Sequence, residues 1–249
     1  MITIKSQSEI DLMRKAGKVV AECHELLESK IEPGITTLEL NRIAEDFIRK
    51  SKAYPTFLGY YDYPFSICAS INEQVVHGFS NKEPLQEGDI LAIDLGATLG
   101  GYVGDAARTH GVGNISEEAK KLIAVTRESF YKGMEFAREG FRVSDISHAI
   151  QTHVEENGFS VVRDYVGHGI GQQMHEEPQV PNFGKPGYGP RLQAGMCLAI
   201  EPMVNIGDYK VRLLDDGWTV VTKDGSLSAH YENTIVITGS GDPEILTLL

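Results

Sequence analysis

Basic residues, long apolar runs and cysteines are all scarce in this sequence. Lys and Arg number 23 against 35 Asp and Glu, so the net charge is −12 and no nucleic-acid partner is expected. No apolar run approaches the ~20 residues of a membrane span, and Met1–Ser6 lacks the apolar centre of a signal peptide. Cys23, Cys68 and Cys197 form no Cys-x-x-Cys pair, which excludes a disulfide framework or a zinc ribbon. These absences predict a soluble, cytoplasmic protein with reduced thiols and no membrane partner.

Apolar side chains recur with helical and strand spacing along the 249 residues, of which 41% are hydrophobic, enough for one large core. Apolar residues spaced three and four positions apart predict helices over 9–29, 36–48, 116–138 and 144–157. Ser6-x-x-Glu9 and Thr36-x-x-Glu39 have the pattern of capping boxes at the start of the first two helices. Strands are predicted over 66–76, 160–166, 196–204, 210–222 and 229–237. A hairpin is predicted over 88–109, with its turn at residues 98–101.

The order helix, helix, strands occurs twice, and part of the sequence repeats with it. Residues 85–94 and 192–201 are identical at six of ten positions, and they end in the acids Asp94 and Glu201. Their offset of 107 residues nearly equals the offset of 106 between Gly34 and Gly140, which precede the second and fourth helices. Two related halves, about 1–110 and 111–249, within one domain spanning 1–249 are the simplest explanation, although ten matching residues also arise by chance.

Two aspartates lie on the arms of the predicted hairpin. A turn centred between Leu99 and Gly100 places Asp94 directly opposite Asp105, with Cβ atoms roughly 4.5 to 5.5 Å apart. Like charges at this separation repel unless a cation lies between them or one is protonated. The alternative is that one aspartate caps a turn or faces solvent. Asp94 ends a strongly apolar strand, which favours the cation because an unpaired buried charge is costly.

Three further polar residues stand at the edges of apolar strands in the second half. His168 lies among glycines in Gly167-His168-Gly169-Ile170-Gly171, and Gln172 stands where a dinucleotide-binding loop needs glycine. Glu201 ends one apolar strand and Glu232 precedes another. A hydrogen-bonded structural histidine and salt-bridged glutamates remain the alternatives when each residue is considered alone.

Taken together, these four carboxylates and one imidazole predict a metal site. Oxygen donors with one imidazole suit a pair of divalent ions such as Co, Mn, Fe(II) or Zn, whose charge four carboxylates balance. Two such ions about 3.5 to 4 Å apart hold a bridging water, lower its pKa and polarise a carbonyl group. The chemistry predicted for this site is therefore hydrolysis.

The motifs that contain these five residues resemble those of methionine aminopeptidases. They are Asp94-Leu95-Gly96, Gly104-Asp105, Gly167-His168-Gly169-Ile170-Gly171, Glu201-Pro202-Met203 and Tyr231-Glu232-Asn233-Thr234. The resemblance covers essentially the whole chain and fits the short bacterial type I form, because no zinc-finger extension precedes residue 9 and the second half has no long insertion. It implies the α+β pita-bread fold, in which two pseudosymmetric αβ halves close a curved antiparallel sheet around the metals.

The resemblance also implies a role for each residue. Asp94 is expected to ligate one metal, Asp105 and Glu232 to bridge both, and His168 and Glu201 to complete the other. Glu201 is also the expected general base towards the bridging water, which attacks the peptide carbonyl. The implied function is removal of the initiator methionine from nascent proteins and peptides when the second residue is small. We also expect a monomer in transient contact with the ribosome.

Two more histidines and an apolar pocket match the family. His77 and His175 are expected to contact the substrate and assist catalysis, although a lone histidine is more often structural. The expected methionine pocket consists of Phe57, Tyr60, Tyr63, Cys68, Met174 and Trp218. This chain departs from a common bacterial form that has Cys at Phe57 and Phe at Met174, and His230 stands where Gln is common.

Two other functions fit parts of the pattern. A proline-directed peptidase of the same superfamily shares all five ligand types, but such enzymes usually carry an extra N-terminal domain, and only about 80 residues precede the predicted hairpin. A non-catalytic binding protein on the same fold typically loses ligands, whereas this chain keeps all five and both histidines. Fold analogy alone does not decide between them, because function depends on the site.

Overall fold

The computed structural model describes residues 1–239 and 241–249. The helices of this part of the chain are α1 (Gln7–Glu28), α2 (Thr37–Lys50), α3 (Glu117–Met134) and α4 (Val143–Glu156). All four predicted helices are confirmed, but α3 ends before the predicted 138 because Phe136 and Ala137 bond three residues back in a tighter turn. None of the described helices has the length and apolarity needed to cross a membrane.

Capping boxes fix where the helices begin. Thr36 Oγ1 accepts the backbone N–H of Glu39 at 3.1 Å, and the Glu39 carboxylate accepts the N–H of Thr36 at 3.0 Å. The Ser6 N–H donates to Glu9 in the same way at 2.8 Å. At α4 the Asp145 carboxylate accepts the N–H of Arg142 at 2.7 Å, so the two halves start their second helices with similar hydrogen bonds.

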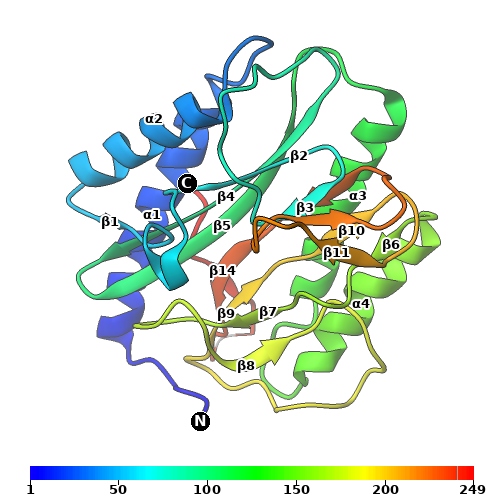
Figure 1. Ribbon diagram of the computed structural model, residues 1–249. Coiled ribbons are helices and arrows are strands. Elements are labelled where there is room, and N and C mark those ends of the chain that lie inside the picture. The colour runs from blue at the N-terminus through cyan, green and yellow to red at the C-terminus, as the bar shows by residue number, and fades with distance from the viewer. Residues whose placement is uncertain (240) are drawn as a thin grey trace.

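The strands of the described residues form four antiparallel sheets, in which the strand orders are β1-β4-β2 with β5 paired to β4, β13-β10-β6, β11-β12-β3 and β15-β14-β9-β7-β8. In the first half the strands are β1 (Tyr54–Pro55), β2 (Cys68–Ile71), β3 (Gln74–Val76), β4 (Ile90–Leu99) and β5 (Tyr102–Gly111). In the second half they are β6 (Ser160–Val161), β7 (Gly167–Gly169), β8 (Glu176–Val180), β9 (Cys197–Ile200), β10 (Met203–Asn205), β11 (Val211–Leu213), β12 (Val220–Thr222), β13 (Ser228–His230), β14 (Asn233–Val236) and β15 (Glu244–Ile245). In Figure 1, α1 and α2 lie on one side of the long β4–β5 hairpin, and α3 and α4 lie on the opposite side of the molecule.

The register of the β4–β5 hairpin differs from the prediction. Gly100 and Gly101 both have positive φ, 61° and 82°, which is the backbone that a two-residue hairpin turn requires. The turn is therefore centred one residue later than expected, and Asp94 pairs with Ala107 while Asp105 pairs with Gly96. The predicted direct opposition of the two aspartates is wrong. They lie diagonally on the same face, still within reach of each other.

The long predicted strands are broken at polar residues. Segment 66–76 is two strands, because Asn72 adopts φ 54° and its side chain bonds both Asp89 and the N–H of Ile90. Segment 196–204 breaks at Glu201-Pro202, where proline supplies no N–H for a ladder, and segment 229–237 breaks around Glu232. Segment 160–166 is a strand only over Ser160–Val161, and segment 210–222 only near its two ends. Strands β1, β7, β8 and β15, which are short or polar, were not predicted.

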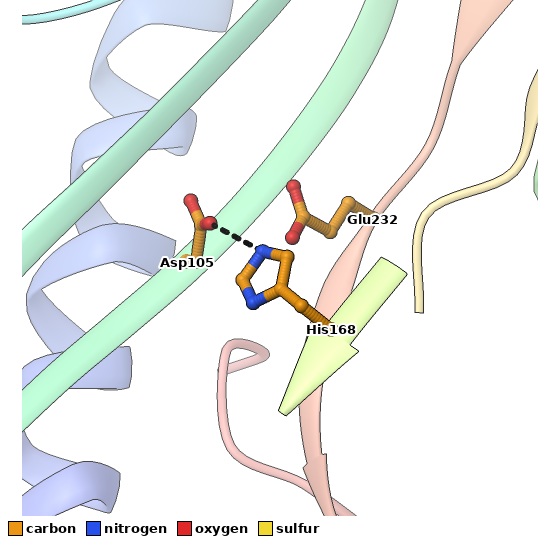
Figure 2. A group of neighbouring side chains, drawn as sticks. All are labelled: Asp105, His168 and Glu232. Atoms are coloured by element: carbon orange, nitrogen blue, oxygen red, sulfur yellow. Dashed lines mark ion pairs between the residues drawn. The ribbon is translucent and has the colours of Figure 1, made fainter. Parts of the chain in front are cut away.

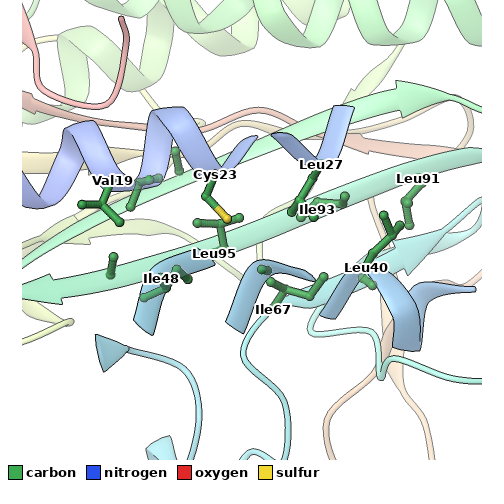
Figure 3. Packing of buried hydrophobic residues seen from close by; sticks show 14 of the residues in the cluster. Val19, Cys23, Leu27, Leu40, Ile48, Ile67, Leu91, Ile93 and Leu95 are labelled. Carbon is green, nitrogen blue, oxygen red and sulfur yellow. The ribbon is translucent and has the colours of Figure 1, made fainter. Parts of the chain in front are cut away.

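The core of the first half lies between its two helices and the hairpin. Figure 3 shows the buried side chains of α1 and α2 against β4: Val19, Cys23, Leu27, Leu40, Ile48, Leu91, Ile93 and Leu95. Strand β4 is buried on both faces, which explains its nearly continuous apolar sequence. A separate cluster joins α3 and α4 to β9 and β14 in the second half. The strand ends that carry the candidate metal ligands lie between these two packed halves.

The arrangement of the two halves follows the sequence repeat. An isolated antiparallel bridge joins Thr36 to Pro84 in the first half, and another joins Arg142 to Arg191 in the second. The paired positions are offset by 106 and 107 residues, as in the sequence.

Candidate metal centre

The five predicted ligands converge from five different segments. Asp94 lies on β4, Asp105 on β5 and His168 on β7, while Glu201 directly follows β9 and Glu232 directly precedes β14. Figure 2 shows His168 pointing between the carboxylates of Asp105 and Glu232. The strand breaks at Glu201 and Glu232 free these two side chains from the regular alternation of a sheet.

The donor atoms are close enough to share cations. One ligand atom each from Asp105, His168 and Glu232 lies within 4.8 Å of the others. His168 Nε2 is 3.9 Å from Asp105 Oδ2 and 3.6 Å from Glu201 Oε1. His168 Nδ1 lies 2.9 Å from the carbonyl oxygen of Gly169, which can only accept, so Nδ1 carries the proton and Nε2 offers its lone pair to the centre.

The electrostatics of the cluster favour a cation. Burial away from water and repulsion between neighbouring carboxylates raise the pKa of Asp105, Glu201 and Glu232 well above the usual range, and burial raises the pKa of Asp94 to about 7. Among the described residues, one buried oxygen each of Asp94, Asp105 and Glu232 has no hydrogen-bond partner. Burial and the neighbouring His175 lower the pKa of His168 to about 3, so the imidazole is neutral, as a metal ligand must be. The residues present therefore fit divalent cations, as the family implies.

The same five residues form one end of a cavity of about 210 Å³. Every other residue predicted for the site also lines it: Phe57, Tyr60, Tyr63, Cys68, His77, Met174, His175 and Trp218. Tyr61 lines it too and was missed by the sequence analysis. It adopts φ 46° in the short 3-10 helix Tyr60–Asp62 and is 78% exposed, so no apolar periodicity marks it.

Two further histidines line the cavity. His77 follows β3 with φ 58° and lies edge-on to Trp218, with ring centres 6.0 Å apart. His175 lies at the exposed rim, 4.3 Å from the His168 ring, and its Nδ1 is 2.7 Å from the hydroxyl of Tyr60. Burial lowers the pKa of His77 to about 4 and also lowers the pKa of His175. Both imidazoles are therefore neutral at pH 7.

The remaining wall of the cavity is apolar and rigid. The hydroxyl of Tyr63 donates to the carbonyl of Gly78 at 2.9 Å, and its ring lies edge-on to Trp218 at 5.0 Å. Phe57 and Met174 are both buried, so the two departures from the common bacterial form lie in the wall itself. Burial raises the pKa of the Cys68 thiol well above its usual range, so this cysteine is protonated and behaves as an apolar side chain.

An ion pair that the sequence analysis missed supports the loop that carries Met174 and His175. Lys5 Nζ lies 2.6 Å from Glu176 Oε2, and the Lys5 side chain is only 2% exposed. Glu176 also accepts the backbone N–H of Gln173 at 3.2 Å. A lysine in an N-terminal segment gives no sequence signal that it will pair with a residue 171 positions away.

Comparisons with known proteins agree with this site. The sequence profile of metallopeptidase family M24 matches residues 11–239. A methionine aminopeptidase from Clostridium perfringens is 63% identical over 249 residues, covering 100% of both chains. Methionine aminopeptidase 1 from Bacillus subtilis is 56% identical over 241 residues, covering 97% of both.

A crystal structure of methionine aminopeptidase from Thermotoga maritima matches with a TM-score of 0.98 at 48% identity, covering 100% of both chains. The predicted α+β pita-bread fold is thereby confirmed. The chain belongs to metallopeptidase family M24 and, within it, to the methionine aminopeptidases, which are peptide hydrolases.

Proposed function

We propose that this chain removes the N-terminal methionine from peptides and nascent proteins when the second residue is small, and that it uses two divalent metal ions. The observation that carries the proposal is the cluster of four carboxylates and a neutral imidazole, with orphaned buried oxygens, at one end of an apolar cavity. Four negative charges balance two dications. Asp94 would ligate one ion, Asp105 and Glu232 would lie between the two, and His168 and Glu201 would complete the other.

The chemistry divides between the metals and the side chains. Two bound divalent ions would lower the pKa of water and polarise the peptide carbonyl. Glu201 is placed to take the proton of the attacking water, because its carboxylate lies between His168 and His230, 3.6 and 3.8 Å from their Nε2 atoms. The carboxylate of Glu201 can hold this proton and then deliver it to the leaving amine.

The two cavity histidines act on the substrate rather than on the metals. We assign the Tyr60 hydroxyl as the donor to Nδ1 of His175, 2.7 Å away, and this assignment leaves the proton of the neutral ring on Nε2. His175 Nε2–H can then donate to the substrate carbonyl oxygen as negative charge develops there. His77 lines the same cavity and would contact the scissile amide.

The apolar end of the cavity selects the first residue of the substrate. Phe57, Tyr63, Cys68, Met174 and Trp218 offer no charged group to an incoming side chain. An unbranched thioether gains from burial against these rings, whereas a charged side chain would lose its hydration without a partner. The second residue of the substrate lies at the mouth, beside Tyr60 and His175, where only a small side chain leaves room for the histidine to act.

Several broader properties follow from this proposal. Residues 1–249 would act as one catalytic domain, with halves about 1–110 and 111–249 contributing two and three ligands respectively. The working form would be a monomer that meets its substrates in the cytoplasm, in transient contact with the ribosome. Co, Mn, Fe(II) and Zn all suit the donor set, so availability would select the metal in the cell.

The direct test is turnover of the peptide Met-Ala-Ser with added Mn²⁺ or Co²⁺. We expect release of free methionine, no release of the first residue from Lys-Ala-Ser, and loss of activity with a chelator. Ala-Pro peptides separate this function from proline-directed hydrolysis. Faster cleavage of an Ala-Pro peptide than of Met-Ala-Ser would overturn the proposal.

A further inference from the structure

Behind the candidate metal centre, the two halves meet along a seam between β5 and the start of β14. These strands belong to different sheets, yet Asp105 lies on β5 and Glu232 directly precedes β14. Ala107 and Glu232 exchange backbone hydrogen bonds of 3.3 and 3.0 Å across the seam. The relative position of the two carboxylates therefore depends on what holds this short contact together.

One side-chain contact binds the backbone of Asp105 directly to β14. The hydroxyl of Thr234 accepts the N–H of Asp105 at 3.0 Å and donates to its carbonyl oxygen at 2.9 Å. Thr234 is fully buried, so water does not compete for these bonds. Any displacement of Thr234 would carry Asp105 with it.

Arg108 binds the backbone of Glu232 from the other side of the seam. Its guanidinium donates to the carbonyl oxygen of Glu232 and, at 2.6 Å, to the side chain of Asn233. The same group lies over the ring of Tyr231, 4.5 Å from its centre. The planar guanidinium thus contacts three consecutive residues around one candidate ligand, a geometry that lysine cannot reproduce.

The C-terminal segment joins these two contacts. Thr247 is fully buried; its hydroxyl donates to Asn233 Oδ1 at 2.9 Å and accepts the N–H of Thr234 at 3.1 Å. Its carbonyl oxygen accepts from Arg108 at 3.3 Å. The preceding residue is pressed against α1, because a Cβ added to Gly17 would lie 2.0 Å from the carbonyl oxygen of Leu246.

We propose that Thr247 and Arg108 are positioning residues for the metal centre, and that the C-terminal segment 246–247 clamps Asp105 and Glu232 at the separation that two cations need. The inference rests on the proposed ligand roles of these two carboxylates. Buried carboxylates repel one another, so a centre without the clamp relaxes by moving its halves apart. Removal of a group that orients a metal ligand typically costs about 10- to 100-fold in metal affinity.

Thr247→Val tests the clamp, because valine keeps the shape of threonine and removes the hydroxyl. Thr126→Val is the matched control, since Thr126 is also buried and its hydroxyl donates to the carbonyl of Leu122 at 2.7 Å within α3, away from the seam. The measurements are Mn²⁺ affinity and stoichiometry by titration calorimetry, and the free energy of unfolding of the metal-free protein. Thr247→Val should bind Mn²⁺ at least about tenfold more weakly, while both variants lose similar stability.

Two further variants keep the test decisive if Thr247→Val folds poorly. Thr247→Ser retains the hydroxyl and should restore the affinity, and Arg108→Lys retains the charge but not the planar contact and should lower it. Wild-type Mn²⁺ affinity in Thr247→Val, or an equal loss in Thr126→Val, would overturn the inference. A wild-type protein that binds two Mn²⁺ without releasing methionine would contradict the proposed activity and leave this comparison valid.

Discussion

Replacing His175 by alanine separates catalysis from metal binding. His175 lies on the loop between β7 and β8, with its ring 4.3 Å from that of His168. Its Nδ1 is already engaged with Tyr60 at 2.7 Å, so Nε2 is the nitrogen that would contact the substrate. Loss of one such donor to a developing oxyanion costs about 2.7 to 4 kcal/mol, or roughly 10²- to 10³-fold in kcat. The metal content should stay at about two ions per chain.

Tyr60→Phe measures how much the hydrogen bond between Tyr60 and His175 contributes to catalysis. It removes one hydrogen bond between neutral groups, worth about 0.5 to 1.5 kcal/mol, so kcat should fall by roughly 2- to 13-fold. His148→Ala is the control, because this exposed histidine on α4 bonds a backbone carbonyl at 3.1 Å and lies outside the cavity. Its kcat should equal that of the wild type.

Steady-state rates on Met-Ala-Ser and metal analysis of the same preparations check these values. Loss of a metal ion from His175→Ala, or a kcat equal to that of His148→Ala, would contradict the role of His175 as a donor to the substrate. His168→Ala provides the contrast, since loss of a ligand should lower metal content and activity together.

Three further predictions concern the ligands, the charge cluster and the buried ion pair. Asp105→Asn should abolish turnover and lower the metal content, because an amide cannot replace a charge shared by two ions; full activity with two metals retained would disprove the bridging role. The melting temperature of the chelated protein should fall as the pH rises from about 6.5 to 8. Folding raises the pKa of the clustered carboxyl groups, so the folded protein holds protons that the unfolded chain has already released, and its free energy of unfolding falls with pH. Calorimetry should find that the melting temperature depends less on pH when Mn²⁺ is bound. A melting temperature of the metal-free protein that does not fall between about pH 6.5 and 8 would contradict a cluster of carboxyl groups with raised pKa. Lys5→Met should lower the free energy of unfolding by about 3 kcal/mol, because it leaves the partly buried carboxylate of Glu176 without its charged partner; urea titration should find part of this loss recovered in Lys5→Met/Glu176→Leu, and an unchanged single variant would contradict the assignment.

Much of the fold was predictable because its signals are local. The capping boxes at Ser6 and Thr36 and the apolar stripes behind them depend on residues three and four positions apart, and the helices begin where these predict. The repeat of residues 85–94 in 192–201 was also visible in the sequence alone. Strand ends were less predictable, because Asn72 and Pro202 interrupt ladders whose apolar pattern continues across them.

The hairpin shows why exact register escapes sequence analysis. A four-residue turn over 98–101 and a two-residue turn at Gly100-Gly101 both fit the glycine pattern, but they differ by two residues in pairing. Positive φ at both glycines selects the second. Asp94 and Asp105 still share a face, because a shift of two residues preserves the alternation of a strand.

The candidate site was predictable to the extent that its residues occur in recognisable motifs. Lys5 and Thr247 do not, because their importance comes from contacts between segments distant in the chain, and Tyr61 does not, because it is an exposed residue of a short 3-10 helix. Thr247 bonds Asn233 and Thr234 from the segment that follows β15, which pairs with β14. No spacing rule along the sequence encodes such a contact.

Anomalous scattering from crystals of the Mn²⁺-loaded protein would show whether the carboxylate cluster holds two metal ions. We predict two manganese peaks about 3.5 to 4 Å apart, with the carboxylates of Asp105 and Glu232 between them and Asp94, His168 and Glu201 at the outer positions. A single peak, or a pair of peaks held by other side chains, would contradict it.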